Sequence, residues 1–474
     1  MPLDLEYGAR ISARGAKSVE SDARTEAPGR FNRSRVLVWL AALAAPAVML
    51  GLIHRYGVNV PYWDEWDQLA VVTSAYDHTL SASQLWEQQN EHRPVVSKLI
   101  SIVIARTTSL DLVAEMYLGF GFQVLSLILI WRMLAACFRS RAPALVGPLT
   151  IAASLLLFWP VAHEDWTWGI ASVQFFLSVL LAVVSVWAVS RWPGRRAGVC
   201  VLSFATMMAI FTTGCGFALI GVGVLGLIGY GIAQKRIPWG QLLVFAVVSS
   251  GCTALYLRGY VSAGYSATSL TRLHPLPMAS YFVTYIGSPF WIRTAGYRSC
   301  QLFGLAGLIS MAAATYYIIR QAPAWVSAAL PWVLLACYSL INAVATALAR
   351  IDLGVDQASS SRYRPIAVLF WISLVVLLSM VAWEARTRFS RSAVVLMTAG
   401  ASVLFLTGYC YLYYRGVGAL TRHSEYVAVG VPWIMDYSHA PDDELRRYHP
   451  NPSIVRELSR KLEKYSLGPF ARRR

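Results

Sequence analysis

Two short polar motifs stand out in this apolar chain because their side chains suit acid–base chemistry. Residues 61–67 read Pro-Tyr-Trp-Asp-Glu-Trp-Asp, which places Asp64 and Glu65 between aromatic residues. Residues 90–93 read Asn-Glu-His-Arg, which adds a carboxylate, an imidazole and a guanidinium shortly afterwards. A carboxylate in such a place can take the proton from an attacking hydroxyl group, or bind a divalent cation through its oxygens. We therefore take Asp64, Glu65, Glu91 and His92 as the candidate catalytic residues.

A second pair of acids, Glu164 and Asp165, lies in a short polar segment between two apolar runs. Adjacent acids so close to a membrane are costly unless they are hydrated or paired. They are candidates for a second functional motif, and the alternative is a solvated helix end. Together with Asp64, they are also the candidate ligands for a divalent metal, Mg²⁺ or Mn²⁺.

Arginines gather late in the chain, in the connection of residues 350–364. The guanidinium group matches the oxygens of a phosphate group bidentately. The residues that we expect to bind a phosphate are Arg350, Arg362, Tyr363 and Arg364, with Arg93 from the earlier motif. The alternative interpretation is that a short loop on the outer side carries these arginines as an exception to the positive-inside rule, by which Lys and Arg gather on the cytoplasmic side.

The elements that must position these residues are transmembrane helices. Only 14% of the 474 residues are charged and 56% are hydrophobic, whereas a soluble protein carries about 25% charged residues. Continuous apolar runs near 20 residues predict membrane-spanning helices rather than strands. We therefore predict an all-α polytopic protein with about eleven spans, in a range of ten to thirteen. The predicted spans are residues 36–54, 112–136, 143–162, 168–190, 197–213, 216–233, 239–257, 301–319, 325–348, 366–383 and 393–413.

The net charge of +16 is carried mainly by short connections between apolar runs. This placement follows the positive-inside rule and argues against nucleic acid as a partner. It predicts a disordered cytoplasmic tail at 1–35, a transmembrane domain at 36–413 and a short periplasmic tail at 414–474 in a bacterial inner membrane. The first periplasmic loop, about 55–111, contains amphipathic helices.

The weakest point of this topology is residues 95–108, which are short and amphipathic. We place them on the membrane surface, because a span there would reverse the orientation of everything that follows. Successive connections between spans then alternate between the two sides of the membrane. This alternation brings all the candidate motifs to one side, with acids from two early loops and bases from the late one. Transfer from a phosphate-linked donor would need such a set. Solvated surface acids and an interfacial aromatic belt are the plainer alternatives.

The layout resembles the GT-C class of integral-membrane glycosyltransferases, which use polyprenyl-phosphate-linked sugars and place catalytic acids in the first outer loop. Residues 62–66 match that motif, and Glu164-Asp165 match a second acidic motif between later spans. More narrowly, the chain resembles a group of bacterial membrane proteins with an aromatic-Asp-[Asp/Glu]-Trp stretch, Asn-Glu-His-Arg and a late Ser-Arg-Tyr. Here these motifs are residues 63–66, 90–93 and 361–363.

The resemblance implies that Asp64 is the general base or a metal ligand, with Glu65 beside it, and that Arg362 and Arg350 hold the lipid phosphate. The partners it implies are a polyprenyl-phosphate-linked sugar, an acceptor glycan or lipid of the cell envelope, and membrane lipid. The large periplasmic domain of oligosaccharyl transferases is missing, so protein N-glycosylation is not expected. The metal pattern is incomplete, and metal dependence stays open.

A transporter or flippase for an envelope lipid or sugar is the alternative from another class, and a scaffold that has lost catalysis is a third. Transporters tend to keep ionisable residues near the membrane midplane and to contain inverted repeats. This sequence clusters its charges at one predicted face and has no visible repeat, which favours the enzyme.

Overall fold

The computed structural model describes residues 33–261, 275–386 and 391–471, and the predicted tail at 1–35 lies almost wholly outside these ranges. The described residues are helical, and they contain isolated β-bridges but no strand. The prediction of an all-α class is therefore confirmed.

Among the described residues, eight segments are long and apolar enough to cross a membrane. Their helices are α1 (Arg33–Tyr56), α5 (Leu112–Phe138), α8 (Gly169–Arg191), α10 (Ala218–Ala233), α11 (Trp239–Leu257), α13 (Tyr297–Gln321), α14 (Val326–Arg350) and α15 (Arg364–Ala385). Two predicted spans are shorter helices, α6 (Val146–Leu157) and α9 (Arg196–Ile210). The protein is thus a polytopic helical membrane protein, while the count of eleven stays a prediction.

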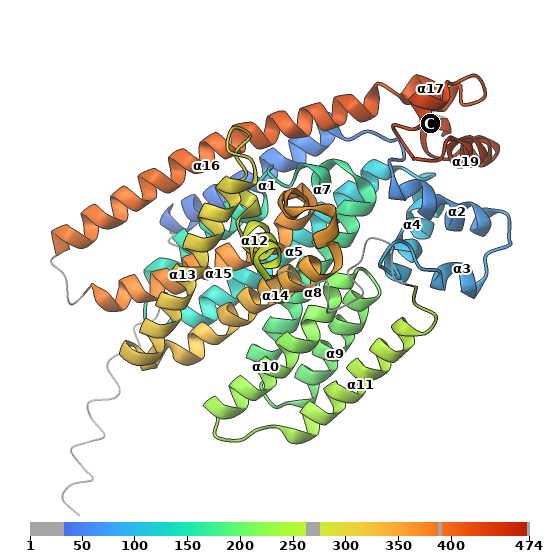
Figure 1. Cartoon of the computed structure of the whole chain (residues 1–474). Coiled ribbons are helices and arrows are strands. Elements are labelled where there is room, and N and C mark those ends of the chain that lie inside the picture. The colour runs from blue at the N-terminus through green and yellow to red at the C-terminus, as the bar shows by residue number, and fades with distance from the viewer. Residues whose placement is uncertain (1–32, 262–274, 387–390, 472–474) are drawn as a thin grey trace, which may run out of the picture.

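The last predicted span, 393–413, falls within a much longer helix, α16 (Arg391–Ala428). We expected this span to end before residue 414, but the helix continues for several turns. Figure 1 shows α16 running along the bundle beside α1 and reaching the C-terminal helices. The predicted boundary between membrane domain and tail is therefore not a break in the fold.

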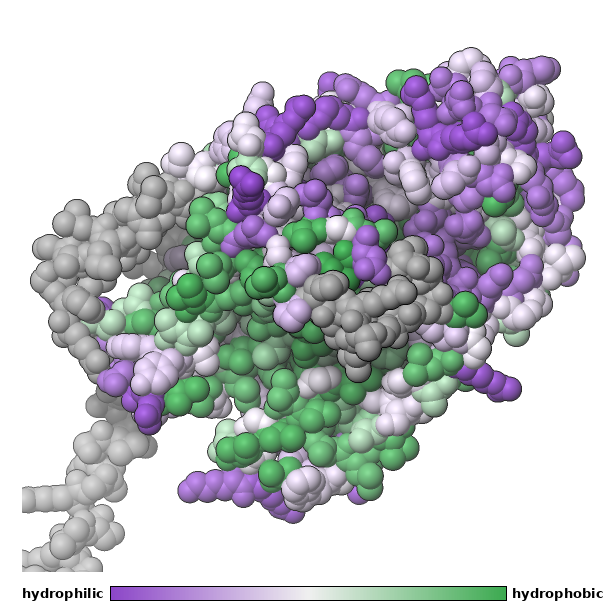
Figure 2. Space-filling model, in the orientation of Figure 1, coloured by the Kyte–Doolittle hydropathy of each residue, from purple (hydrophilic) through white to green (hydrophobic). Residues whose placement is uncertain are grey.

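The centre of the bundle is α8, which packs against α5, α9, α10, α14 and α15. Small buried residues along α8, such as Ser172, Ser178 and Ser185, allow the neighbouring helices to approach closely. Figure 2 shows apolar side chains over the middle of the molecule and hydrophilic ones at the end formed by the first connection and the C-terminal helices.

The first connection folds into three helices, α2 (Asp64–Tyr76), α3 (Ala82–Trp86) and α4 (Val95–Thr108). Helix α4 buries one face, including Ser101 and Ala105, and exposes Leu99 and Val103 on the other. This is the amphipathic helix expected at 95–108, and it is too short to count among the candidate spans.

The C-terminal residues do not form a separate tail. Helices α17 (Val431–Met435), α18 (Asp442–Leu445) and α19 (Pro452–Tyr465) share a hydrophobic core with the first connection. Its buried residues include Trp66 and Leu69 from α2 and Leu458 and Leu462 from α19. We call this unit, residues 59–111 together with 427–470, the cap. The sequence predicts a short tail at 414–474, and the structure shows that much of this segment shares one core with the first connection.

Several connections that were predicted to lie on the same side of the membrane do lie together. Residues 90–92, 213–215 and 362–363 line one cavity at the cap end of the bundle. At the opposite end, Arg139 and Arg191 line a different hollow. The fold therefore separates the candidate motifs from the positively charged connections.

Candidate functional site

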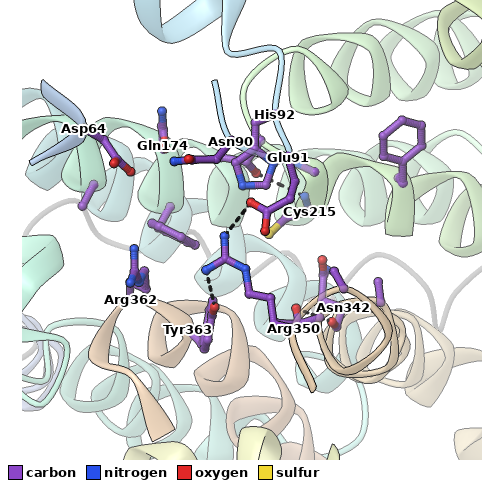
Figure 3. Close-up of a pocket in the computed structure, with 18 of the residues that line it drawn as sticks. Asp64, Asn90, Glu91, His92, Gln174, Cys215, Asn342, Arg350, Arg362 and Tyr363 are labelled. Carbon is purple, nitrogen blue, oxygen red and sulfur yellow. Dashed lines mark hydrogen bonds and ion pairs between the residues drawn. The ribbon is translucent and has the colours of Figure 1, made fainter. Parts of the chain in front are cut away.

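The main cavity has a volume of about 320 Å³ and lies where the cap meets the ends of several spans. Figure 3 shows carboxylates from the cap on one side and arginines from the late connection on the other. Its polar lining residues are Asp64, Asn90, Glu91, His92, Gln174, Thr213, Cys215, Asn342, Thr346, Arg350, Arg362 and Tyr363. Asp64, Glu91, His92, Arg350, Arg362 and Tyr363 are thus brought together as the sequence predicted.

Asp64 is the first residue of α2 and faces the cavity (Figure 3). Trp63 before it has a φ of 47°, an unfavourable value for a non-glycine residue, and its N–H donates to the Tyr448 carbonyl at 2.6 Å. Within the described chain the Asp64 carboxylate has no hydrogen-bond or ion-pair partner. It is half-exposed and lies at the first residue of a helix, at the positive end of the helix dipole.

A tight turn presents the second motif. Asn90 takes a left-handed φ of 49°, which asparagine tolerates better than most residues. The N–H groups of Gln89 and His92 donate to each other's carbonyls at 2.8 and 2.9 Å. The Gln89 side chain donates to the Asp64 carbonyl at 2.8 Å. These bonds fix Glu91 and His92 beside the start of α2.

Glu91 is ion-paired rather than free. Arg350, at the end of α14, donates from Nη2 to Glu91 Oε2 at 2.8 Å and from Nη1 to the Tyr363 hydroxyl at 2.9 Å. Burial acts to raise the pKa of Glu91, but the Arg350 guanidinium holds it below its ordinary value. Glu91 is therefore anionic, and it orients Arg350 instead of serving as a base.

The His92 ring accepts a backbone hydrogen bond in this site. The Gly214 N–H donates to its Nδ1 at 3.1 Å, so a neutral ring carries its proton on Nε2. Burial lowers the pKa of His92 to about 4, which keeps the ring neutral. Its Nε2–H can bind an oxygen acceptor but cannot take up a proton, which leaves Asp64 as the candidate base.

Glu65 does not lie beside Asp64 in the cavity, contrary to expectation. It is buried, and its carboxyl accepts from the backbone N–H groups of Ile170 at 3.0 Å and Tyr62 at 2.8 Å. Burial, and then the nearby Glu115, raise its pKa well above the ordinary value. Successive helical side chains point about 100° apart, so the residue after Asp64 faces the protein interior. Its role is to fasten the start of α8.

Arg93 also lies outside the cavity. Its guanidinium is buried and donates to three carbonyls, those of Trp86 at 2.7 Å, Tyr256 at 2.7 Å and Arg258 at 2.8 Å. These bonds tie the first connection to the end of α11. Arg93 is not among the residues that line the cavity, and these three bonds make it a clamp, while its predicted phosphate-binding role stays a prediction.

The second acidic motif occupies a different place. Glu164 and Asp165 belong to the short helix α7 (His163–Thr167), and Glu164 lines a second cavity together with Arg364. Asp165 is fully buried, and its carboxyl oxygens have no partner from another described residue. Burial, and then the adjacent Glu164, raise the pKa of Asp165 well above its ordinary value.

The candidate metal ligands are therefore not gathered. Asp64 lines the main cavity, whereas Glu164 lines the second one and Asp165 is enclosed behind it. In the described ranges no three His, Cys, Asp or Glu side chains are placed to hold a metal ion together. The three candidate ligands do not fit a single site for Mg²⁺ or Mn²⁺, which the sequence had left open, and we derive no step through a metal ion.

Sequence reasoning missed Gln174 on α8 and Asn342 on α14, which both line the main cavity. Their signal was present, because polar residues inside apolar runs usually face a cavity or a partner.

Comparison with known protein families, curated proteins and solved structures finds no match to this chain. The function is therefore argued from the cavity itself.

Proposed function

We propose that the protein is a membrane glycosyltransferase that moves a sugar from a polyprenyl-phosphate donor to a glycan or lipid of the cell envelope. The supporting observation is that one cavity at the ends of the spans places the Asp64 carboxylate opposite Arg362, with Arg350 alongside. A proton acceptor and two cations across one cavity are what this transfer requires.

The donor phosphate would bind between Arg350 and Arg362. Arg350 is held in orientation by Glu91 and Tyr363. Arg362 donates from Nε to Ser360 Oγ at 3.3 Å, and its side chain points into the cavity (Figure 3). Apolar residues of the spans, such as Phe175 and Ala349, line the same cavity, so the prenyl chain can lie along the helices.

In the proposed reaction an acceptor hydroxyl attacks the anomeric carbon of the sugar, and its proton passes to Asp64. A bond forms between the acceptor oxygen and the anomeric carbon. The bond from that carbon to the phosphate oxygen breaks, and polyprenyl phosphate leaves with the electron pair. Arg362 and Arg350 stabilise the charge on the leaving phosphate, and His92 donates from Nε2 to a substrate oxygen. Attack opposite the leaving group inverts the configuration.

The proposal places the cap end in the periplasm of a bacterium and the N-terminus in the cytoplasm. The arginine-rich connections at the opposite end fit that orientation, because positive charges are retained on the cytoplasmic side. An envelope acceptor then meets the cavity from the periplasm, and the lipid-linked donor meets it from the membrane.

The test is turnover of labelled polyprenyl-phosphate sugars by the purified protein in lipid discs. Because a general base contributes roughly 10²- to 10⁴-fold, Asp64→Asn should lose at least about a hundredfold. The matched control is Glu65→Gln, which replaces a buried carboxyl next to Asp64 outside the cavity. Equal activity of Asp64→Asn and the wild type would refute the mechanism. Donor binding without any turnover in either protein would instead favour the transporter.

A further inference from the structure

The second cavity is a separate site in the structure. It has a volume of about 420 Å³ and lies between α7, α16 and the connection that precedes α15. It shares no lining residue with the main cavity, although the turn η8 (Ser361–Tyr363) contributes to both: Ser361 lines the second cavity, and Arg362 and Tyr363 line the main one. A ligand here would therefore be bound by its own set of side chains.

Three guanidinium groups line this cavity. Arg415 and Arg422 are seven residues apart on α16, so they lie two turns apart on one face. Neither forms an ion pair with an acid in the described part of the chain. Arg415 is half-buried, whereas Arg422 is exposed. They form a cationic row along the cavity, and neither is ion-paired within the part of the chain that the structure describes.

The third guanidinium, that of Arg364, is 7% exposed. It donates from its Nη atoms to the carbonyls of Val161 and Ser359, but among the described residues its Nε–H has no partner. A buried donor without an acceptor is costly, and such groups usually meet a ligand or water. The unpaired N–H is therefore a second and independent sign of a binding site.

The rest of the lining suits a phosphate group on a hydroxylated carrier. Ser359, Ser360 and Ser361 bring hydroxyl groups, and Glu164 and Asp356 bring carboxylates that can accept hydrogen bonds from a carrier's hydroxyls. Burial lowers the pKa of His163 to about 4, so this residue adds no charge. The three arginines outnumber the two carboxylates, which leaves a net positive site.

We propose that the second cavity binds a phosphate group, with Arg415 and Arg422 as its main ionic contacts. The phosphate belongs either to a lipid headgroup or to a soluble phosphate ester, since both present the same oxygens to the guanidinium groups. This site is independent of the proposed sugar transfer, because none of its residues lines the main cavity.

The test uses the full-length protein in dodecyl maltoside, a detergent that carries no phosphate. Native mass spectrometry with added phosphatidylglycerol measures headgroup binding, and isothermal titration with glucose 1-phosphate measures soluble-ester binding. The test variant is Arg415→Gln with Arg422→Gln. The matched control is Arg293→Gln with Arg298→Gln, which removes the same charge from exposed residues close to the cavity that do not line it.

We expect the wild type and the control pair to bind at least one probe, and the test pair to bind it about tenfold more weakly or worse, since a lost charged hydrogen bond has about that effect. Binding of the lipid alone assigns the headgroup, and binding of glucose 1-phosphate assigns the soluble ester. No binding of either probe by the wild type overturns the proposal, as does an equal loss in both pairs. If the double variant does not fold, the exposed Arg422→Gln alone decides by the same comparison.

Discussion

Replacing Arg93 tests whether this residue is a structural clamp or a phosphate ligand. Its buried guanidinium donates to three backbone carbonyls from two parts of the chain, each within 2.8 Å. A hydrogen bond from a charged group contributes about 1.5 to 3 kcal/mol. In Arg93→Gln the shorter amide can replace only one of the three bonds. We therefore expect the free energy of unfolding to fall by about 3 to 5 kcal/mol.

The assay is reversible unfolding with SDS in mixed micelles, followed by tryptophan fluorescence and circular dichroism. The matched control is Arg106→Gln, because Arg106 is exposed and donates to a single carbonyl, that of Ala75 at 2.7 Å. Its loss should cost no more than about 1 kcal/mol. If the two variants unfold at the same SDS fraction, the clamp is refuted. Unchanged stability with lost donor binding would restore the phosphate-binding role.

Three further predictions follow from the same geometry. The ion pair with Arg350 lowers the pKa of Glu91, so the stabilisation that it gives is present above the unfolded pKa of about 4.3 and is lost as pH falls through the folded pKa. Unfolding measured at several pH values should show that the free energy of unfolding falls less steeply at acid pH in Glu91→Gln than in the wild type. Burial raises the pKa of Asp165, so its contribution to stability is greatest below the unfolded pKa of about 3.9 and declines as pH rises toward the folded value. Asp165→Asn should therefore gain stability relative to the wild type as pH rises above about 3.9 in the same assay, and a constant difference would contradict this. A Cβ on Gly416 would lie 2.7 Å from the Pro160 carbonyl carbon. Gly416→Ala should therefore push α16 away from the backbone at Pro160 and lower the free energy of unfolding by about 1 to 3 kcal/mol. The control Gly408→Ala, whose added Cβ would meet open space, should change the free energy of unfolding little.

The helices, and the fact that residues from several connections line the main cavity, could be predicted from the sequence because both follow from one-dimensional patterns. Apolar runs set the helices, and alternation placed Asp64, His92 and Arg350 on one side. The errors concern neighbours in sequence. Glu65 and Arg93 each stand next to a cavity residue, but the local backbone turns them toward the interior. Only three-dimensional packing decides which member of an adjacent pair faces a cavity.

The separation of Glu164 from Asp64 could not be predicted for a different reason. Both belong to acidic motifs on the same predicted side, and sequence order does not say how connections are distributed around a bundle. The position of α7 between α8 and α16 directs Glu164 to the second cavity. The cap was hidden in the same way, because its two halves are far apart in sequence and the core that joins them is visible only in three dimensions.

The divided cap also sets an order of events during synthesis. Trp66 and Leu69 leave the ribosome early, but their packing partners Leu458 and Leu462 are among the last residues made. At about 5 to 20 residues per second, the first half waits roughly twenty to eighty seconds for the second. During that time its apolar face has no native cover, and Tyr448 is not yet there to hold Trp63. The turn before Asp64 is thus completed only late in translation, and a chain that stops before α19 would lack the part of the cap core that Leu458 and Leu462 supply.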